Sequence, residues 1–261
     1  MYPIVISAPH AQTKITERNI RKRLKLSDYE IWKCSDPFTA NLKEFTCAWY
    51  IQKAKTHRLV CDINRPPNDK AFHEYDFFGR KVFHQGMHFT EKEKAGLLEK
   101  HWFPYHEKLE KKIIELDKKV KKPILFIDYH NTSGDHPLNQ RHEYMPGIVI
   151  SNLGAPETGK KTALHPNISI AANQIQFLKK AINDELGIRV EINEVYSGGY
   201  NTVWGSQLKE KLKLRNHLHT IQIEYNLDFI ANPLSKKIDR KALKIMQTAL
   251  NKAIIKLYKN L

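Results

Sequence analysis

Short apolar, largely β-branched runs alternate along this chain with longer stretches whose apolar residues recur at helical spacing. The apolar runs predict strands over residues 2–8, 58–63, 123–129, 147–151, 188–192 and 220–225. The helical patterns cover residues 16–24, 37–55, 90–122 with a kink at Pro104, 169–186 and 235–259. Such alternation predicts an α/β fold with a mainly parallel mixed sheet flanked by helices on both faces.

The chain of 261 residues contains no stretch rich enough in Gly or Ser to mark a linker, so we expect a single domain over residues 1–261. A hydrophobic fraction of 41% with 10% aromatic residues excludes collagen-like and disordered classes. No run approaches the roughly 18 apolar residues of a membrane span, and the first ten residues lack a secretory pattern. Three cysteines without CxxC spacing indicate reduced thiols. We therefore expect a cytoplasmic protein without a membrane partner.

The formal net charge of +15 is of the kind found in nucleic-acid-binding proteins. Most of the excess lies in residues 108–122 and 235–259, where Lys alternates with apolar and acidic residues at helical spacing, as on a solvated helix face. No DNA or RNA recognition motif accompanies it, so we expect no specific nucleic-acid partner. A basic nucleic-acid-binding protein with a vestigial site remains an alternative, and its affinity would fall steeply with salt.

Polar residues follow the predicted strands at the edge where α/β sheets bind ligands. His10 follows the first strand, Asn64 and Arg65 the second, and His130 and Glu224 lie at the ends of two others. We expect these side chains to converge on one rim. Each histidine taken alone is more often a loop or capping residue than a metal ligand. Two residues before His130, a carboxylate at position 128 would share its side of the strand and could orient the imidazole, or could cap a helix.

Seven short segments follow one another in the order typical of a known enzyme family. They are ISAPHAQ at 6–12, SD at 35–36, CDINRPP at 61–67, PYH at 104–106, DYHN at 128–131, SGGY at 197–200 and QIEYN at 222–226. The chain resembles the N-formylglutamate amidohydrolases from residue 4 to about residue 230. The segments DINRPP and QIEYN are the most specific of the seven.

The resemblance implies a zinc-carboxypeptidase-like (phosphorylase/hydrolase-like) fold, shared with the aspartoacylases. It further implies a Zn²⁺ ion bound by His10, Asp36 and His130, with Glu224 as the general base that activates water. Because 26 residues separate Asp36 from His10, an alternative is that Asp36 caps a helix beginning at Pro37. The reaction implied is hydrolysis of N-formyl-L-glutamate to formate and glutamate, a step of histidine degradation.

The resemblance also implies a set of substrate contacts on the same rim. Arg65 would act in catalysis and, with Asn64, bind a substrate carboxylate. An alternative is that Arg65 pairs with Asp62. The remaining contacts implied are Tyr200, Gly199 and His106. For the SGGY segment, an ordinary turn is an equally consistent interpretation.

Three positions depart from the family pattern, which has Asp where this chain has Gly147, Ser where it has Asn131, and a second Asp near Ala40. These departures concern the pocket wall and leave a small-molecule N-acyl amino acid as the expected substrate. A zinc carboxypeptidase or peptide amidase with a larger substrate is the second enzyme hypothesis, and a wide cleft at loops 68–89 and 131–145 would favour it. The sequence carries no indication of the oligomeric state.

Overall fold

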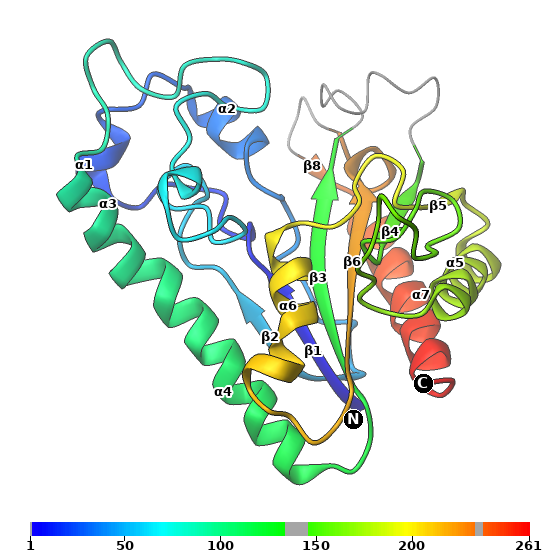
Figure 1. The fold of residues 1–261 in the computed structure, drawn as a ribbon. Helices are drawn as coiled ribbons and strands as arrows, with labels where there is room; N and C mark the ends of the chain where they lie inside the picture. The colour runs from blue at the N-terminus through cyan, green and yellow to red at the C-terminus, as the bar shows by residue number, and fades with distance from the viewer. Residues whose placement is uncertain (1, 134–145, 233–236) are drawn as a thin grey trace.

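Six strands form one mixed sheet in the order β2-β1-β3-β6-β4-β5 in the computed structural model of this protein, which describes residues 2–133, 146–232 and 237–261 (Figure 1). The neighbouring strands β2, β1, β3 and β6 are all parallel, β4 runs antiparallel to β6, and β5 is parallel to β4. The predicted α/β fold with a mainly parallel mixed sheet is therefore confirmed.

The strands of this sheet are β1 (Tyr2–Ala8), β2 (Ala48–Lys53), β3 (Ile124–Thr132), β4 (Ile148–Ser151), β5 (Val190–Ile192) and β6 (Leu218–Asn226), and β7 (Ala231–Asn232) pairs separately with β8 (Lys237–Ile238). The α-helices are α1 (Arg18–Arg21), α2 (Asp28–Lys33), α3 (Glu91–Leu97), α4 (Phe103–Lys119), α5 (Ala172–Leu186), α6 (Tyr200–Lys211) and α7 (Arg240–Tyr258). Short helical turns are η1 (Asp69–Ala71), η2 (Leu98–Trp102) and η4 (Leu227–Phe229).

Strand β3 is buried over its whole length because helices cover both faces of the sheet (Figure 1). Since successive side chains of a strand point to opposite faces, Ile127 and Tyr129 pack in the core formed with α5 and α7, whereas Phe126 packs with α4 and α6. His130 and Glu224 are register partners on β3 and β6. Both therefore lie at the carboxyl end of the sheet, on the face covered by α4 and α6.

The long helical segment is divided as predicted. Thr90 and Glu93 form a capping box that begins α3, and the π-helical turn η2 separates α3 from α4 just before Pro104. Proline has no amide hydrogen and cannot continue the regular hydrogen-bond ladder, which accounts for the change of helical pitch there. In the part of the chain that is described, no helix is long and apolar enough to cross a membrane.

Three local predictions are wrong. The helix expected over residues 37–55 is replaced by irregular chain and by the edge strand β2. The strand expected over residues 58–63 is a series of turns, in which Val60 N–H donates to His57 O and Asp62 N–H to Ala71 O. Its apolar side chains are buried although the segment pairs with no strand. The apolar run therefore indicated burial correctly but not the secondary structure. Of the helix expected over residues 16–24, only α1 is helical.

Helix α6 was not predicted because its buried face carries no apolar period. Trp204 and Leu208 are buried on it together with Asn201, Thr202 and Gly205. Gly205 lies so close to the sheet that an added Cβ would come within 2.8 Å of Phe126 Cδ1. Small and polar residues let α6 approach the sheet closely. The sequence of α6 therefore lacks the regular apolar spacing from which a helix is predicted.

Candidate metal centre

A cavity of about 290 Å³ opens at the carboxyl ends of β1, β3 and β6. His10 lies just after β1, His130 on β3, Glu224 on β6, and Asp36 on the irregular segment between α2 and β2. The residues predicted from the sequence that line it are His10, Asp36, Asn64, Arg65, His130, Gly199 and Glu224. Sheet topology therefore gathers at one rim side chains that are far apart in the chain.

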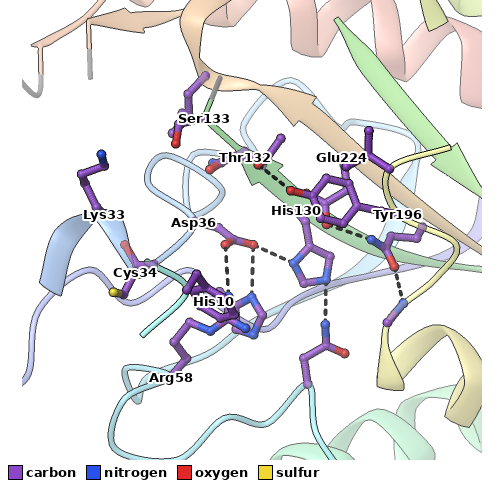
Figure 2. Close-up of a pocket in the computed structure, with 18 of the residues that line it drawn as sticks. His10, Lys33, Cys34, Asp36, Arg58, His130, Thr132, Ser133, Tyr196 and Glu224 are labelled. Atoms are coloured by element: carbon purple, nitrogen blue, oxygen red, sulfur yellow. Dashed lines mark hydrogen bonds and ion pairs between the residues drawn. The ribbon is translucent and has the colours of Figure 1, made fainter. Parts of the chain in front are cut away.

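Three of these side chains form a compact group of possible metal ligands. Nitrogen or oxygen atoms of His10, Asp36 and His130 all lie within 4.8 Å of one another, and all three residues are buried. Asp36 Oδ2 lies 2.6 Å from His130 Nδ1 and 3.3 Å from His10 Nδ1. Figure 2 shows the Asp36 carboxylate facing the rings of both histidines. Two imidazole nitrogens and one carboxylate oxygen are a donor set that Zn²⁺ binds, with a fourth position left open.

The outer nitrogen of each imidazole faces a second carboxylate. His10 Nε2 lies 2.9 Å from Asp62 Oδ1, and His130 Nε2 lies 3.0 Å from Asp128 Oδ1. A carboxylate can only accept, so Asp62 favours for His10 the tautomer with the proton on Nε2 and the Nδ1 lone pair directed at the centre. Carboxylates placed in this way orient metal-ligating histidines in proteins. The buried residues around the group therefore fit a bound cation.

Burial and opposite charges compete at this centre. Burial alone would lower the pKa of His130, but the carboxylates of Asp128 and Asp36 raise it well above the ordinary value. Burial likewise opposes ionisation of Asp36, yet the two imidazoles lower its pKa. The carboxylates around the histidines thus create a site in which positive charge is strongly favoured.

Glu224 stands beside this group on the neighbouring strand. Burial raises the pKa of its carboxyl group to about 8, although His130 acts in the opposite direction. Gln222 Nε2 donates a hydrogen bond of 2.8 Å to Glu224 Oε1, which fixes the orientation of the carboxyl group. A carboxyl group with a pKa near neutrality is suited to exchange protons with a reacting molecule.

Asp62 is the centre of a buried hydrogen-bond network that the sequence did not predict. It accepts hydrogen bonds from His10 Nε2, from Arg58 Nη2 at 2.9 Å, from His73 Nε2 at 2.8 Å and from Asn64 N–H at 2.9 Å. Burial opposes its ionisation, but Arg58 and then His10 lower its pKa well below the ordinary value. The only signal in the sequence was its place in the DINRPP segment.

Arg65 does not pair with Asp62, so the alternative role considered for it is wrong. Arg58 occupies that position, while the backbone carbonyl of Arg65 accepts a hydrogen bond from Trp102 Nε1. Among the described residues the Arg65 guanidinium has no hydrogen-bond or ion-pair partner, although it lines the cavity. It is therefore available for an anionic ligand.

The glycine pair of the SGGY segment makes room for Asn64. Gly198 has a φ of +117°, in the left-handed region that glycine tolerates. A Cβ added at Gly199 would lie 2.7 Å from Asn64 Nδ2. Asn64 in turn accepts a hydrogen bond of 2.8 Å from Asn201 N–H, and its Nδ2 lies 3.2 Å from His130 Nε2. The backbone at Gly199 thus approaches the Asn64 side chain closely.

His106 and Tyr200 do not line the cavity, contrary to the expected substrate contacts. His106 is buried behind it, where its ring stacks on Trp102 with centroids 3.8 Å apart and its Nε2 lies 3.0 Å from Asn201 Oδ1. Tyr200 begins α6, and its ring centroid lies 6.0 Å from that of Trp102. His106 thus contacts the first turn of α6, to which Tyr200 itself belongs and which holds Asn64.

The turn that carries Asp36 is followed by residues 37–47, which form no helix in the described chain, so its expected alternative role as a helix cap is wrong. Of the three departures from the family pattern, Asn131 lines the cavity, whereas Ala40 and Gly147 do not. Of the two loops considered for a wider cleft, loop 68–89 contributes Phe77 to the wall. Residues 134–145 of the other loop lie outside the described residues.

The chain is similar to known proteins in sequence and in fold. The family described as N-formylglutamate amidohydrolase matches residues 2–231. The N-formylglutamate deformylase of Pseudomonas aeruginosa is 25% identical over 237 residues, which cover 85% of this chain and 79% of that protein.

Two solved structures share the fold. The crystal structure of N-formylglutamate amidohydrolase from Ralstonia eutropha has a TM-score of 0.75 at 13% identity, covering 99% of this chain and 95% of that one. The structure of a gene product from Agrobacterium tumefaciens has a TM-score of 0.64 at 17% identity, covering 98% of this chain and 92% of that one.

Proposed function

Because this chain belongs to the N-formylglutamate amidohydrolase family, we propose that it hydrolyses the amide bond of N-formyl-L-glutamate to give formate and glutamate. The observation that carries the proposal is the group formed by His10, Asp36 and His130, with Glu224 beside it on the same cavity. A cavity of about 290 Å³ is at the small end of ligand pockets, which favours a small substrate over a peptide.

The proposed cofactor is Zn²⁺, held by His10 Nδ1, Asp36 Oδ2 and His130 Nδ1. Zinc bound in such a site lowers the pKa of water toward about 7 and polarises the carbonyl of the scissile amide. Asp62 accepts a hydrogen bond from the outer nitrogen of His10 and keeps the His10 ligand atom directed inward, and the carboxylate of Asp128 lies 3.0 Å from the outer nitrogen of His130.

Glu224 is the proposed general base. With Oε1 held by Gln222, its Oε2 remains for the attacking water, whose proton it accepts and then returns to the leaving amine. A cation held by the neighbouring ligands would favour the carboxylate form of Glu224, because an opposite charge nearby lowers the pKa of a carboxyl group.

Arg65 is the proposed anchor for the substrate. Its guanidinium offers a planar pair of donors to a carboxylate of the amino acid, and it lies on the same wall as Asn64. Binding the carboxylate there orients the acyl group toward Glu224 and the metal ligands.

The test is to measure zinc content and glutamate release from N-formyl-L-glutamate for the wild type and three variants. We expect about one zinc per wild-type chain and loss of both zinc and activity in His130→Ala. Glu224→Gln should keep the zinc and lose about 10²- to 10⁴-fold in turnover. The matched control is Glu191→Gln, which changes a carboxylate of the same sheet that does not line the cavity. Full activity of Glu224→Gln would contradict the proposed mechanism.

A panel of N-acyl amino acids and dipeptides assayed with the same enzyme decides between the two enzyme hypotheses. We expect N-formyl-L-glutamate to be turned over faster than any dipeptide. A dipeptide preferred over every N-acyl amino acid would favour the peptidase hypothesis instead.

A further inference from the structure

Asp36 lies on an irregular segment far from any sheet strand in the chain, whereas His130 lies in β3 and His10 follows two residues after β1. Asp36 lies in the turn after α2, and its N–H donates a hydrogen bond of 3.1 Å to His10 O. Its own carbonyl accepts from the hydroxyl of Thr39 at 2.8 Å. These contacts hold the peptide groups on both sides of the Asp36 Cα, but the direction in which the chain leaves the turn depends on the next peptide group.

The peptide group between Pro37 and Phe38 has an unusual conformation. Phe38 has a φ of +74°, in the left-handed region that a side chain disfavours. Because the peptide group is planar, its rotation would change the φ of Phe38 and at the same time move the carbonyl oxygen of Pro37. A contact that holds the Pro37 oxygen therefore also holds the strained conformation of the turn that begins at Asp36, which Thr39 N–H closes by a hydrogen bond to Asp36 O.

Asn131 supplies that contact. Its Nδ2 donates one hydrogen bond to Pro37 O and another, of 3.0 Å, to the hydroxyl of Tyr225. Because Pro37 O can only accept, the amide nitrogen must face it, and both donor hydrogens are then used. Asn131 is buried, and Tyr225 is its register partner on β6, so the side chain is fixed against the rigid centre of the sheet.

Adjacent residues of β3 thus have two roles. One is a possible metal ligand, and the next contacts the turn that carries another ligand, Asp36. His130 faces the metal centre, whereas Asn131 contacts the turn that passes over the end of the strand. Asn131 Oδ1 is buried and has no hydrogen-bond partner among the described residues. Such an unpaired acceptor is unfavourable, and a side chain serving packing alone would avoid it.

We propose that Asn131 is a positioning residue that holds the Asp36 turn in its ligating geometry and thereby sets the affinity of the site for zinc. This inference rests on the zinc-dependent function proposed above. Loss of a residue that orients a metal ligand typically weakens metal affinity 10- to 100-fold. The side chain itself contributes no atom to the metal.

The experiment measures the zinc dissociation constant by competition with a chromophoric chelator for the wild type, Asn131→Leu and Tyr225→Phe. Asn131→Leu keeps the approximate shape and removes both donors, and we expect zinc affinity to fall about 10- to 100-fold. Tyr225→Phe removes only the second acceptor and leaves the contact with Pro37, so we expect its affinity to stay within about threefold of wild type.

Asn131→Ser covers the case in which Asn131→Leu fails to fold. Its hydroxyl has one hydrogen and a shorter reach, so we expect a loss of about tenfold in a folded protein. Wild-type zinc affinity in either folded Asn131 variant would overturn the inference, as would an equal loss in Tyr225→Phe. A wild-type chain that binds no zinc would instead overturn the proposed function, so the two failures are distinguishable.

Discussion

Asp36 Oδ2 lies 2.6 Å from His130 Nδ1, although 94 residues separate the two in the chain. His130 is carried to the rim by a fully buried central strand, whereas Asp36 reaches it from an irregular turn. The position of His130 follows from the sheet. The position of Asp36 depends on contacts that its turn makes with neighbouring residues. The metal centre therefore depends on both, and the following predictions test the contacts separately.

Asp62→Asn should weaken zinc binding while Asp36, His10 and His130 remain in place. The side chains that face the Asp62 carboxylate are all hydrogen-bond donors. In asparagine one carboxylate oxygen is replaced by an NH₂ group, which cannot accept a hydrogen bond from them. We expect the zinc dissociation constant to rise about 10- to 100-fold in chelator competition. Asp117→Asn is the control, because Asp117 accepts from Asn216 N–H and does not line the cavity. Equal weakening in both variants would indicate general destabilisation instead.

Arg65→Lys should raise the KM for N-formyl-L-glutamate and leave the zinc content unchanged. Lysine offers a point charge without the planar pair of donors that matches a carboxylate. A charged hydrogen bond contributes about 1.5–3 kcal/mol, so we expect an increase of roughly tenfold or more in KM. Steady-state kinetics with N-formyl-L-glutamate measures it, and an unchanged KM would exclude Arg65 as the substrate anchor.

Gly199→Ala should reduce kcat/KM through Asn64. The new Cβ would lie 2.7 Å from Asn64 Nδ2, so the amide must move, and it lies against His130. Small displacements at an active site reduce rates strongly, and we expect a loss of roughly 10- to 100-fold in kcat/KM. Gly96→Ala in α3 is the matched control, since nothing lies within 4 Å of a Cβ added there. A Gly199→Ala enzyme as active as Gly96→Ala would show that the packing against Asn64 is unimportant.

Acid should destabilise the protein through His57. Burial lowers the pKa of His57 to about 3 from an ordinary value of 6.5, while its Nε2 contacts Ile31 O at 3.0 Å. The unfolded chain therefore binds a proton below pH 6.5 that the folded protein does not, and the stability due to neutral His57 is lost as the pH falls from 6.5 toward 3. At pH 4.5 we expect this single group to have lowered the free energy of unfolding by about 3 kcal/mol.

Denaturant unfolding of the wild type and His57→Gln at pH 7 and pH 4.5 isolates this contribution. Other groups titrate equally in both proteins, so the change in unfolding free energy between the two pH values should be smaller in His57→Gln. The same change in both proteins would show that another group is responsible.

The α/β class, the strands β1, β3 and β6, and the place of His10, His130 and Glu224 at strand ends could be predicted from the sequence. Continuous apolar runs mark strands buried on both faces, and the residues that follow them must lie at the rim. The same reasoning failed for residues 58–63, because burial without strand pairing produces the same apolar run. It also failed for β2, an edge strand in which three successive residues, 49–51, are only half-buried and show no alternation.

The tertiary structure alone decided which polar groups meet. From the sequence, Arg58 and Arg65 are both close enough to Asp62 to pair with it, and only the folded turns select Arg58. The place of His106 behind the cavity and the contact of Asn131 with the Asp36 turn were likewise invisible in the sequence. The spacing of apolar residues in the sequence indicates which parts of a segment are buried. A hydrogen bond between distant residues depends instead on the path of irregular turns across the end of the sheet, and such turns have no regular apolar spacing.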